Sequence, residues 1–452
     1  MSMKRLIKRL FLLTTLTLFV SGCDLFSGGS NVSKYDPFAP EDVVDGICYT
    51  AVEEEGYAVF NGIYDNIAFN KAYQNVKVFE VKSTYKGYPV VTVLSNALGS
   101  GDCSSIEEII IPASVKTVEN GAFGKCTNLK KLVLNEGLEV IGNSAFKALG
   151  AENIVDFVVP STVKKIGIEA LPRSSRTLTV PNEIEELGDV CLIYNTFDEI
   201  RLPSTLKKMG ADVFAHSHAK SIVMSDEITS LPTEAFAYIQ GVESIHISNA
   251  LKTLPARAFY SINDETIDAS NIPPVEITGG ESIEVIEDEA CLTSSIRYFP
   301  YSNVLRSIPG DRSMYYVGNR NFPQSLTSIN ETAFKYNSAE YDDVPAVYPS
   351  GIRYVPDYLF SGCNFADTTI TITVGDGGYI GEGSFYGTNL TEVYINASNF
   401  KIKRSAFADC KNLENIYFSG SVSVFRNTSK ATNWNSGIKA TCVHCRDGDF
   451  DF

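Results

Sequence analysis

Positive charge is scarce in this chain of 452 residues. It has 38 Lys and Arg against 54 Asp and Glu, which gives a formal net charge of -16 at pH 7. Such a surplus of negative charge disfavours electrostatic binding to nucleic acid or to anionic lipid, so we expect no nucleic-acid partner. The rest of the composition is typical of a folded protein with a substantial core, because 44% of the residues are hydrophobic and 20% are charged.

The sequence motifs of common enzymes are also absent. There is no glycine-rich phosphate loop, no nucleophile elbow and no H-E-x-x-H zinc motif. Carboxylates such as Glu107, Asp198 and Glu199 fall at outward strand positions, where a solvated face is the ordinary outcome. An enzyme needs groups that converge in a closed cleft, and a glycan-degrading enzyme needs paired carboxylates across a groove. We therefore expect no catalytic residue, no cofactor and no small-molecule substrate.

Long apolar runs are missing everywhere except at the N-terminus. Residues 4–9 contain four basic side chains, residues 10–20 are apolar apart from threonines, and Val20-Ser21-Gly22-Cys23 follows. This order predicts a secretory signal peptide over residues 1–22, whose apolar run is too short to span a bilayer. The Val-Ser-Gly-Cys stretch resembles a bacterial lipobox, which would lipidate Cys23 and make it the mature N-terminus. The alternative is an ordinary signal peptide with a cysteine by chance.

The residues after the predicted cleavage site indicate a tether. Residues 27–42 are rich in Gly, Ser, Pro and Asp, a composition typical of a flexible linker. We expect residues 23–42 to form a lipidated, flexible N-terminus that attaches the folded part to one of the two membrane leaflets. The sequence thus predicts an exported lipoprotein at the outer membrane or cell surface.

One residue position, which we call the anchor, recurs about every 23 residues along the rest of the chain. It is most often the Phe of an Ala-Phe pair, and successive anchors lie 20 to 26 residues apart except for steps of 32 and 43 around Cys291. The anchors are Leu98, Phe123, Phe146, Leu171, Cys191, Phe214, Phe236, Phe259, Cys291, Phe334, Phe360, Phe385 and Phe407. The chain is therefore a repeat protein of about 13 coils.

Two further columns keep the same register. An aliphatic residue or Met lies five residues before nearly every anchor, and Pro, Asn or Ser commonly lies eleven before it. Just ahead of that Pro/Asn/Ser column, short apolar segments predict one parallel strand per coil, which the proline ends. These segments are residues 106–111, 129–134, 154–159, 197–202, 242–247, 390–395 and 413–418. No single coil buries its own apolar face, so the coils are stable only when stacked.

A strand-plus-turn unit of this length that reads L-x-x-L-x-L is the leucine-rich repeat pattern. With Ile141-Gly142 ahead of the anchor and A-F-x-x-C at 122–126 and 406–410, residues 85–420 resemble the BspA-like leucine-rich repeat surface proteins. The resemblance implies an α/β-type repeat solenoid, mostly parallel β with short turns or helical segments. The chain departs from the pattern at Leu171, Cys191 and Cys291, which replace the anchor Phe.

The ends and one internal region fall outside the regular pattern. Residues 43–84 alternate in polarity and are rich in Tyr, which predicts a β-hairpin cap over the first coil. Residues 421–452 are expected to form a C-terminal cap and tail. Residues 260–350, where the spacing stretches, are expected to hold an irregular insertion of the kind that often carries function.

Most cysteines fit the repeat better than a disulfide framework. Cys126, Cys363 and Cys410 each follow an anchor by three residues, and Cys191 and Cys291 are anchors, so we predict buried thiols. Cys48 and Cys103 have no assignment from the pattern.

The motif Cys442-Val443-His444-Cys445 invites a metal interpretation. Tetrahedral zinc needs two more ligands, and no second cysteine pair lies nearby, so we expect no metal and instead a terminal structural element or a local disulfide. His216 and His218 are expected to be exposed turn residues.

The concave sheet is the expected binding surface, because repeat arrays present extended recognition faces. The fifth position of each predicted strand points outward, and the residues there include Val133, Val158, Arg201, His246, Tyr394 and Tyr417. The alternative is that β-branched and aromatic residues simply favour strands. The family resemblance implies a non-enzymatic adhesin that binds proteins of a host or a neighbouring cell. A competing interpretation is an envelope scaffold that organises other surface components without host contact.

Overall fold

The computed structural model describes residues 43–452 except for residues 148–153, 264–274, 293, 297, 315–316, 318–319, 335–340 and 345–347. The predicted signal peptide, Cys23 and the tether lie outside the described residues. Residues from Asp42 to Phe452 form one compact unit. Within the described ranges, no helix has the length and apolar character to cross a membrane.

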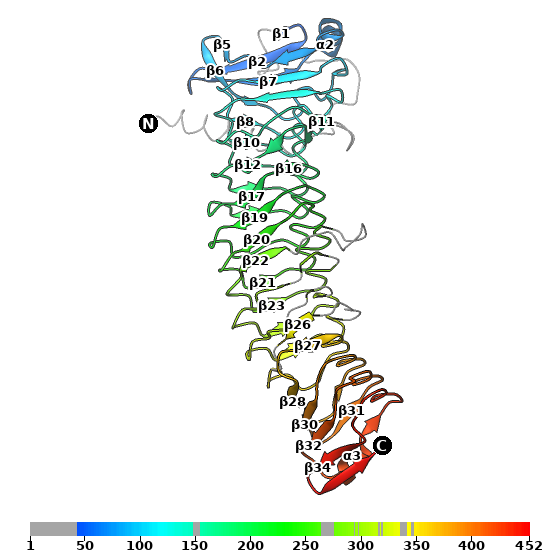
Figure 1. Cartoon of the computed structure of the whole chain (residues 1–452). Helices are drawn as coiled ribbons and strands as arrows, with labels where there is room; N and C mark the ends of the chain where they lie inside the picture. Colours follow the sequence, from blue (N-terminus) through cyan, green and yellow to red (C-terminus); the bar gives the residue numbers. More distant parts are fainter. Residues whose placement is uncertain are drawn as a thin grey trace, which may run out of the picture. The chain divides into compact units, whose positions relative to one another are not determined.

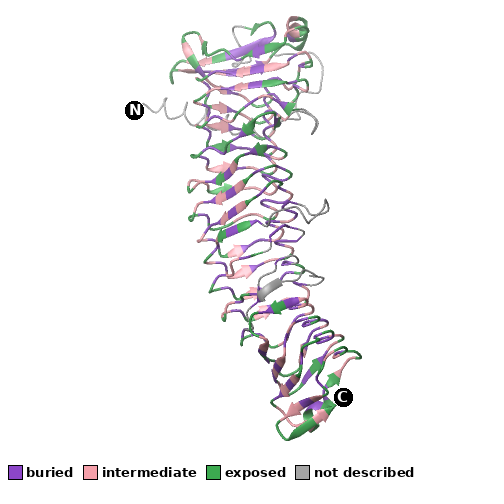
Figure 2. Cartoon of the chain, viewed as in Figure 1, coloured by how far each residue is buried: buried purple, intermediate pink, exposed green. Residues whose placement is uncertain are grey.

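The coils stack in chain order through a primary ladder of parallel strands (Figure 1). Alternate side chains along each strand are buried, which is the burial expected of a half-exposed sheet (Figure 2). The strands are β4 (Val78–Glu80), β7 (Glu108–Ile111), β9 (Lys131–Leu134), β17 (Glu199–Leu202), β19 (Ser221–Met224), β20 (Ser244–Ile247), β22 (Glu276–Gly279), β28 (Thr369–Thr373), β30 (Glu392–Asn396), β32 (Asn415–Phe418) and β34 (Cys442–Cys445). A separate parallel pair joins β26 (Tyr341–Val344) to β27 (Cys363–Phe365), which lies in the same coil as β28. The parallel solenoid predicted from the sequence is confirmed.

A second parallel ladder carries the aliphatic column that precedes the anchors. Its strands are mostly two residues long and are, in the first run, β6 (Tyr88–Val93), β8 (Thr117–Val118), β10 (Val140–Ile141), β12 (Lys165–Ile166), β15 (Glu186–Leu187) and β18 (Lys208–Met209). The later runs are β21 (Thr253–Leu254), β23 (Val285–Ile286), β24 (Ser307–Ile308) and β25 (Ser328–Ile329), and β29 (Gly378–Ile380), β31 (Phe400–Ile402) and β33 (Ser429–Lys430). Two short pairs lie elsewhere, β11 (Ile154–Val155) with β13 (Arg173–Ser174) and β14 (Thr177–Leu178) with β16 (Thr196–Phe197). The strand predicted over 154–159 is therefore shorter than expected.

The anchors fill the interior between the two ladders. Every one of the 13 predicted anchors is at most 8% exposed. The prediction is one residue off at Cys191, because the anchor position of that coil is taken by buried Leu192, two residues after the left-handed Val190. Neighbouring anchor rings stack, as in Phe214 and Phe236, whose centroids are 6.0 Å apart with nearly parallel planes. Burial of a large side chain contributes roughly 1.5–3 kcal/mol, so this column is a principal source of stability.

The structure adds one coil that the sequence analysis missed. In β24, Ile308 takes the aliphatic position of the second ladder, and the fully buried Met314, two residues after the left-handed Arg312, takes the anchor position. Ser313 takes the place of the Ala that precedes most anchors. Ser313 is fully buried, its backbone oxygen accepts a hydrogen bond from the Cys291 N–H, and its hydroxyl donates to the Gly310 oxygen at 3.0 Å. The step of 43 residues after Cys291 is therefore two coils, and the solenoid has about 14.

Much of the region expected to be an insertion belongs to the stack. The ladder runs without interruption through β21, β23, β24 and β25, and β22 pairs with β20. Pro273-Pro274 and parts of 307–323 lie outside the described residues. Because this coil has Met314 in place of Phe and has Ile308 six residues before the anchor instead of five, regular coils within 260–350 looked irregular from the sequence.

In most coils, a residue with a left-handed backbone conformation lies just before the anchor. Two residues before most anchors the backbone φ is between 50° and 63°, although only two of these residues are glycine. They are Asn96, Gly121, Ser144, Glu169, Asp212, Glu234, Arg257, Glu289, Tyr358, Gly383 and Ser405. Non-glycine residues adopt this conformation at a cost of about 1–2 kcal/mol each, which the stacking contacts must offset.

The ends of the parallel stack carry antiparallel strands. At the N-terminal end, β1 (Val43–Val44), β2 (Ile47–Val52) and β3 (Tyr57–Ile63) pair antiparallel, and β3 then pairs parallel with β6. The helix α2 (Asn66–Tyr73), capped by the Asp65 side chain, and the short strand β5 (Thr84–Tyr85) complete this end. At the C-terminal end, the helix α3 (Val422–Asn427) leads to an antiparallel hairpin of β34 and β35 (Gly448–Asp451).

Candidate binding surface

The predicted outward side chains line up across the primary ladder in three segments, which we together call the outward column. In the first segment, Ile110 of β7 is paired with Val133 of β9. Asp156 bridges to Lys131, two residues before Val133, so Val158 continues the same row. Val158 is 50% exposed, which makes this segment an apolar, partly open surface.

The second segment is polar. Arg201, Val223, His246 and Thr278 occupy successive rungs of β17, β19, β20 and β22. The Arg201 Nε donates to the Glu199 carboxylate at 2.7 Å. The two ring nitrogens of His246 lie 3.0 Å from the Thr278 hydroxyl and 3.3 Å from the Asp226 carboxylate. These contacts hold both side chains in fixed positions.

The third segment is aromatic. Thr371, Tyr394, Tyr417 and His444 occupy successive rungs of β28, β30, β32 and β34. The rings of Tyr394 and Tyr417 stack with centroids 4.6 Å apart, and the His444 ring lies 5.2 Å from that of Tyr417. The Tyr394 hydroxyl donates to the Glu392 carboxylate at 3.2 Å, and desolvation together with this bond raises the pKa of Tyr394. The phenol therefore stays a hydrogen-bond donor near neutral pH.

The sequence analysis missed Thr371, Thr278 and His444 as members of the column. A longer connection precedes β34, because Val443 pairs with Ile416 across 27 residues, whereas Ile416 pairs with Val393 across 23. The alternation of Cys442, buried Val443 and His444 was the available signal, since it matches that of the preceding strand.

A second row of aromatic rings lies at the turns. Both His216 and His218 are exposed, as predicted, and His216 has a left-handed backbone. The His216 ring stacks between Tyr194 and Tyr238 at centroid distances of 5.0 and 4.5 Å. Because these rings cover each other's faces, this row presents ring edges to solvent.

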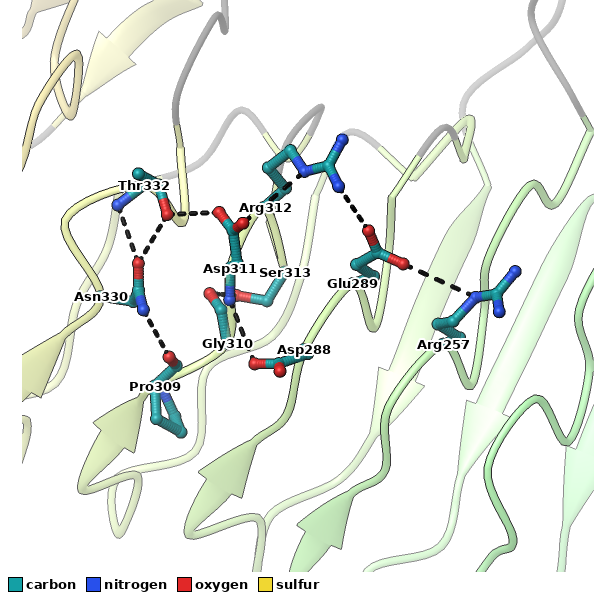
Figure 3. A network of polar contacts seen from close by, with 10 residues as sticks. All are labelled: Arg257, Asp288, Glu289, Pro309, Gly310, Asp311, Arg312, Ser313, Asn330 and Thr332. Atoms are coloured by element: carbon teal, nitrogen blue, oxygen red, sulfur yellow. Dashed lines mark hydrogen bonds and ion pairs between the residues drawn. The ribbon is translucent and has the colours of Figure 1, made fainter.

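The left-handed turn residues of neighbouring coils form an alternating charge ladder (Figure 3). Arg257 pairs with Glu234 of the preceding coil and lies 3.6 Å from Glu289 of the next. Arg312 then donates to Glu289 at 2.7 Å. The Arg257 guanidinium also covers the ring of Tyr260 at 4.3 Å. Opposite charges thus alternate from coil to coil and stabilise their stacking.

The cysteines of the described residues are all free thiols. Seven of them are buried, including Cys126, Cys363 and Cys410, and Cys103 donates to the Leu98 oxygen at 3.4 Å. Cys442 and Cys445 lie three residues apart on strand β34, so their Cα atoms are about 10 Å apart, beyond the reach of a disulfide. Of the two sequence-based alternatives for this motif, the terminal structural element agrees with the geometry.

A groove of about 380 Å³ lies between residues 206–209 and 227–232. Leu206, Met209, Ile228 and Leu231 supply its apolar lining, and Lys207, Lys208 and Glu227 its charges. Thr229, Ser230 and Pro232 complete the lining.

The repeat pattern matches a known family over most of the chain. The BspA type leucine rich repeat region matches in six copies over residues 72–177, 172–274 and 312–435. Among curated proteins, none matches. Similar solved structures include a leucine-rich repeat protein from Bacteroides ovatus, with 18% identity, a TM-score of 0.41 and coverage of 84% of this chain and 88% of that one. A leucine rich cell surface protein from Faecalibacterium prausnitzii has 19% identity, a TM-score of 0.36 and coverage of 86% and 97%.

The pneumococcal vaccine antigen PcpA is also similar, with 14% identity, a TM-score of 0.36 and coverage of 88% of this chain and 97% of that one. The family match extends over more than half of the chain and coincides with the coils described above. The chain belongs to the BspA-type leucine-rich repeat proteins.

Proposed function

We propose that this chain is a lipid-anchored, non-enzymatic adhesin that binds a protein of a host or neighbouring cell through the outward column. The signal peptide and lipobox sequence of residues 1–23 support export and attachment through Cys23. The similar proteins include a leucine rich cell surface protein and a vaccine antigen, which supports a surface location.

The stacked pair of Tyr394 and Tyr417 is the observation that carries the proposal. Both rings are half-buried and held in place by each other and by the strand pairing of β30 with β32. Rigid aromatic side chains with a polar tip dominate protein interfaces, because they bury much area at little entropic cost. The preference of tyrosine for strands would explain isolated tyrosines. It does not explain why Tyr394 and Tyr417 stack next to a third ring, that of His444.

A second candidate is an envelope scaffold that organises other surface components. The charge ladder of Arg257, Glu289 and Arg312 favours it, since a rigid stack suits a spacer as well as a binder. The two functions differ in which side of the envelope the solenoid faces. An adhesin must be open to the exterior, whereas a scaffold that faces inward is protected from it.

The experiment compares cells that carry the wild-type chain with cells that carry Tyr394→Ser/Tyr417→Ser. Loss of two interface aromatics should weaken adhesion to host cells or partner bacteria at least about tenfold, given the usual cost of truncating such residues. Tyr386→Ser is the matched control, because Tyr386 is also exposed, at 43%, but lies outside the column.

Protease treatment of intact cells completes the test. Cleavage of the solenoid together with loss of adhesion supports the adhesin. Full protection from protease supports the inward-facing scaffold. Equal adhesion by the double variant and the Tyr386→Ser control would remove the outward column from the function.

A further inference from the structure

The C-terminal hairpin places four side chains of metal-binding type on one face. In its register Cys442 of β34 lies opposite Asp451 of β35, and His444 lies opposite Asp449. Residues two apart on a strand point to the same face, and directly opposite residues of paired strands do so as well. Cys442, His444, Asp449 and Asp451 therefore all point to one face of the hairpin. The sequence holds no second cysteine pair for a metal, but the Asp449 and Asp451 carboxylates of β35 lie opposite this motif.

Three of these side chains already converge. One ligand atom each from Cys442, His444 and Asp449 lies within 4.8 Å of the others. The His444 Nδ1 is 2.9 Å from the Asp449 Oδ1 and 4.0 Å from the Cys442 Sγ. Tetrahedral zinc, with bonds of about 2.0–2.3 Å, needs roughly 3.4 Å between nitrogen and oxygen and roughly 3.6 Å between sulfur and nitrogen. Both observed distances are within about 0.5 Å of those values.

The frame that holds these ligands is rigid. Strand β34 is paired on one side with β32 and on the other with β35, and its Val443 is fully buried. The Phe450 ring of β35 packs against Phe425 of α3 at 5.3 Å. The Tyr417 ring lies beside the His444 ring and fixes its plane. A site made before the metal arrives avoids most of the ordering cost of binding.

We propose that Cys442, His444 and Asp449 bind one Zn²⁺ ion, with Asp451 placed to supply a fourth ligand. A thiolate and an imidazole favour zinc over magnesium or calcium, which prefer oxygen ligands alone. On binding, the Cys442 thiol releases its proton to solvent, and the proton on the His444 Nδ1 moves to Nε2, so that both donor atoms are free. The ion would join β34 to β35 at the end of the parallel ladder, beside Tyr417 of the outward column.

The test is a titration of the full chain, purified in detergent and reduced, with Co²⁺ and then with Zn²⁺. We expect one Co²⁺ per chain with the near-ultraviolet charge-transfer absorption of a cobalt–thiolate bond, and its displacement by Zn²⁺. Cys442→Ala should abolish that absorption and weaken Zn²⁺ binding by at least the 10–100-fold seen for loss of outer-shell partners. Asp449→Asn should weaken binding while keeping the absorption.

Cys445→Ala is the matched control, because Cys445 lies on the other face of the same strand and packs against the core. It should leave the Co²⁺ absorption and the Zn²⁺ affinity unchanged. Hydrogen exchange of residues 442–451 without metal establishes that each variant retains the hairpin. If the wild-type chain shows no cobalt–thiolate absorption, or if Cys442→Ala and Cys445→Ala bind Zn²⁺ alike, there is no such site.

Discussion

The rings of Phe385 and Phe407 are 22 residues apart in sequence and stack with centroids 5.1 Å apart and an interplanar angle of 4°. Phe360 stacks on the other side of Phe385 at 5.3 Å. Each anchor ring thus contributes to its own coil and to both neighbours. In a stacked array, stability is divided between single coils and the interfaces between adjacent coils.

Phe385→Ala should therefore damage three coils in graded fashion. A buried Phe→Ala change costs about 3–5 kcal/mol. We expect hydrogen-exchange protection to fall most around residues 378–396, less at the Phe360 and Phe407 coils, and not at all near Phe123. Tyr386→Ala, at the next residue and 43% exposed, is the control and should change little. Uniform loss of protection over the whole solenoid would contradict the nearest-neighbour description.

Substitution of Arg320 should destabilise the solenoid, because its guanidinium is buried in the interior. Its side chain is 1% exposed, covers the Phe334 ring at 4.2 Å, and donates through Nε to the Leu359 oxygen at 2.7 Å. Arg320→Met keeps the apolar bulk but removes donors to buried carbonyls, which costs about 1–3 kcal/mol. Arg320→Ala should cost more, because it also opens a cavity. Chemical denaturation followed by exchange of residues 348–365 measures both, and equal stability of all three proteins would exclude a structural role.

Ion pairs between the first coils predict that the stability of the protein depends on pH in the acid range. The carboxylate of Glu107 accepts hydrogen bonds from Lys130 and Lys77, at 2.8 and 2.6 Å, which lowers the pKa of Glu107 to about 2. Since this folded-state pKa lies below the unfolded value of about 4.3, the stabilisation is present above about pH 4.5 and is lost as the pH falls toward 2.

The stability difference between wild type and Glu107→Gln should narrow over that pH range. Thermal unfolding at low salt, at several pH values, measures the difference, and added salt should reduce it at every pH. Glu55→Gln, in the turn between β2 and β3, is the control for loss of one negative charge. A difference that stays constant from pH 6 to pH 2 would show that Glu107 does not act through its ion pairs.

The thiols should divide into two reactivity classes. Burial raises the pKa of the Cys191 and Cys291 thiols, and both side chains are fully buried, so they stay protonated and inaccessible. In chelator-treated native protein, alkylation should label the partly exposed Cys442 and Cys445 first, and the seven buried cysteines only after denaturation. A disulfide-linked peptide containing Cys126, Cys363 or Cys410 in the non-reduced protein would refute the buried-thiol prediction.

The lipid anchor has a direct test. Cys23→Ala should give a protein that no longer partitions into detergent and is not labelled by fatty acid, because stable attachment takes two or more acyl chains. Unchanged partitioning of the variant would show that Cys23 is not the lipidated residue.

The solenoid could be predicted from the sequence because each anchor has the same packing requirement. Leu171 and Cys291 could be recognised in place of Phe, since both are apolar and buried, whereas Cys191 is mistaken for its neighbour Leu192, because both are apolar and buried in the core. Met314 could not, because Ser313 replaces the usual Ala before it and the aliphatic Ile308 lies six residues ahead of it instead of five. The burial of polar Ser313 next to it is explained by the Ser313 hydroxyl, which donates to the Gly310 oxygen.

The outward column was predictable from strand position, but its partners were not. Tyr394 and Tyr417 follow from the alternation of their strands, whereas the neighbour of Tyr417 depends on which later segment pairs with β32. The juxtaposition of His444 and Asp449 depends on the turn at residues 446–447, for which Asp447-Gly448 was the available signal. Likewise, the ion pair between Arg257 and Glu234 depends on the left-handed turns that superimpose from coil to coil.

The antiparallel strands at the two ends of the described solenoid set a limit on growth by self-association. A parallel ladder that stopped at an open coil would offer its unpaired edge to another molecule, and filaments could extend without limit. At one end β1 is only two residues long, and at the other β35 carries Asp449 and Asp451 at its edge. Both are poor templates for a further strand. The antiparallel end strands therefore disfavour end-to-end association of solenoids into filaments.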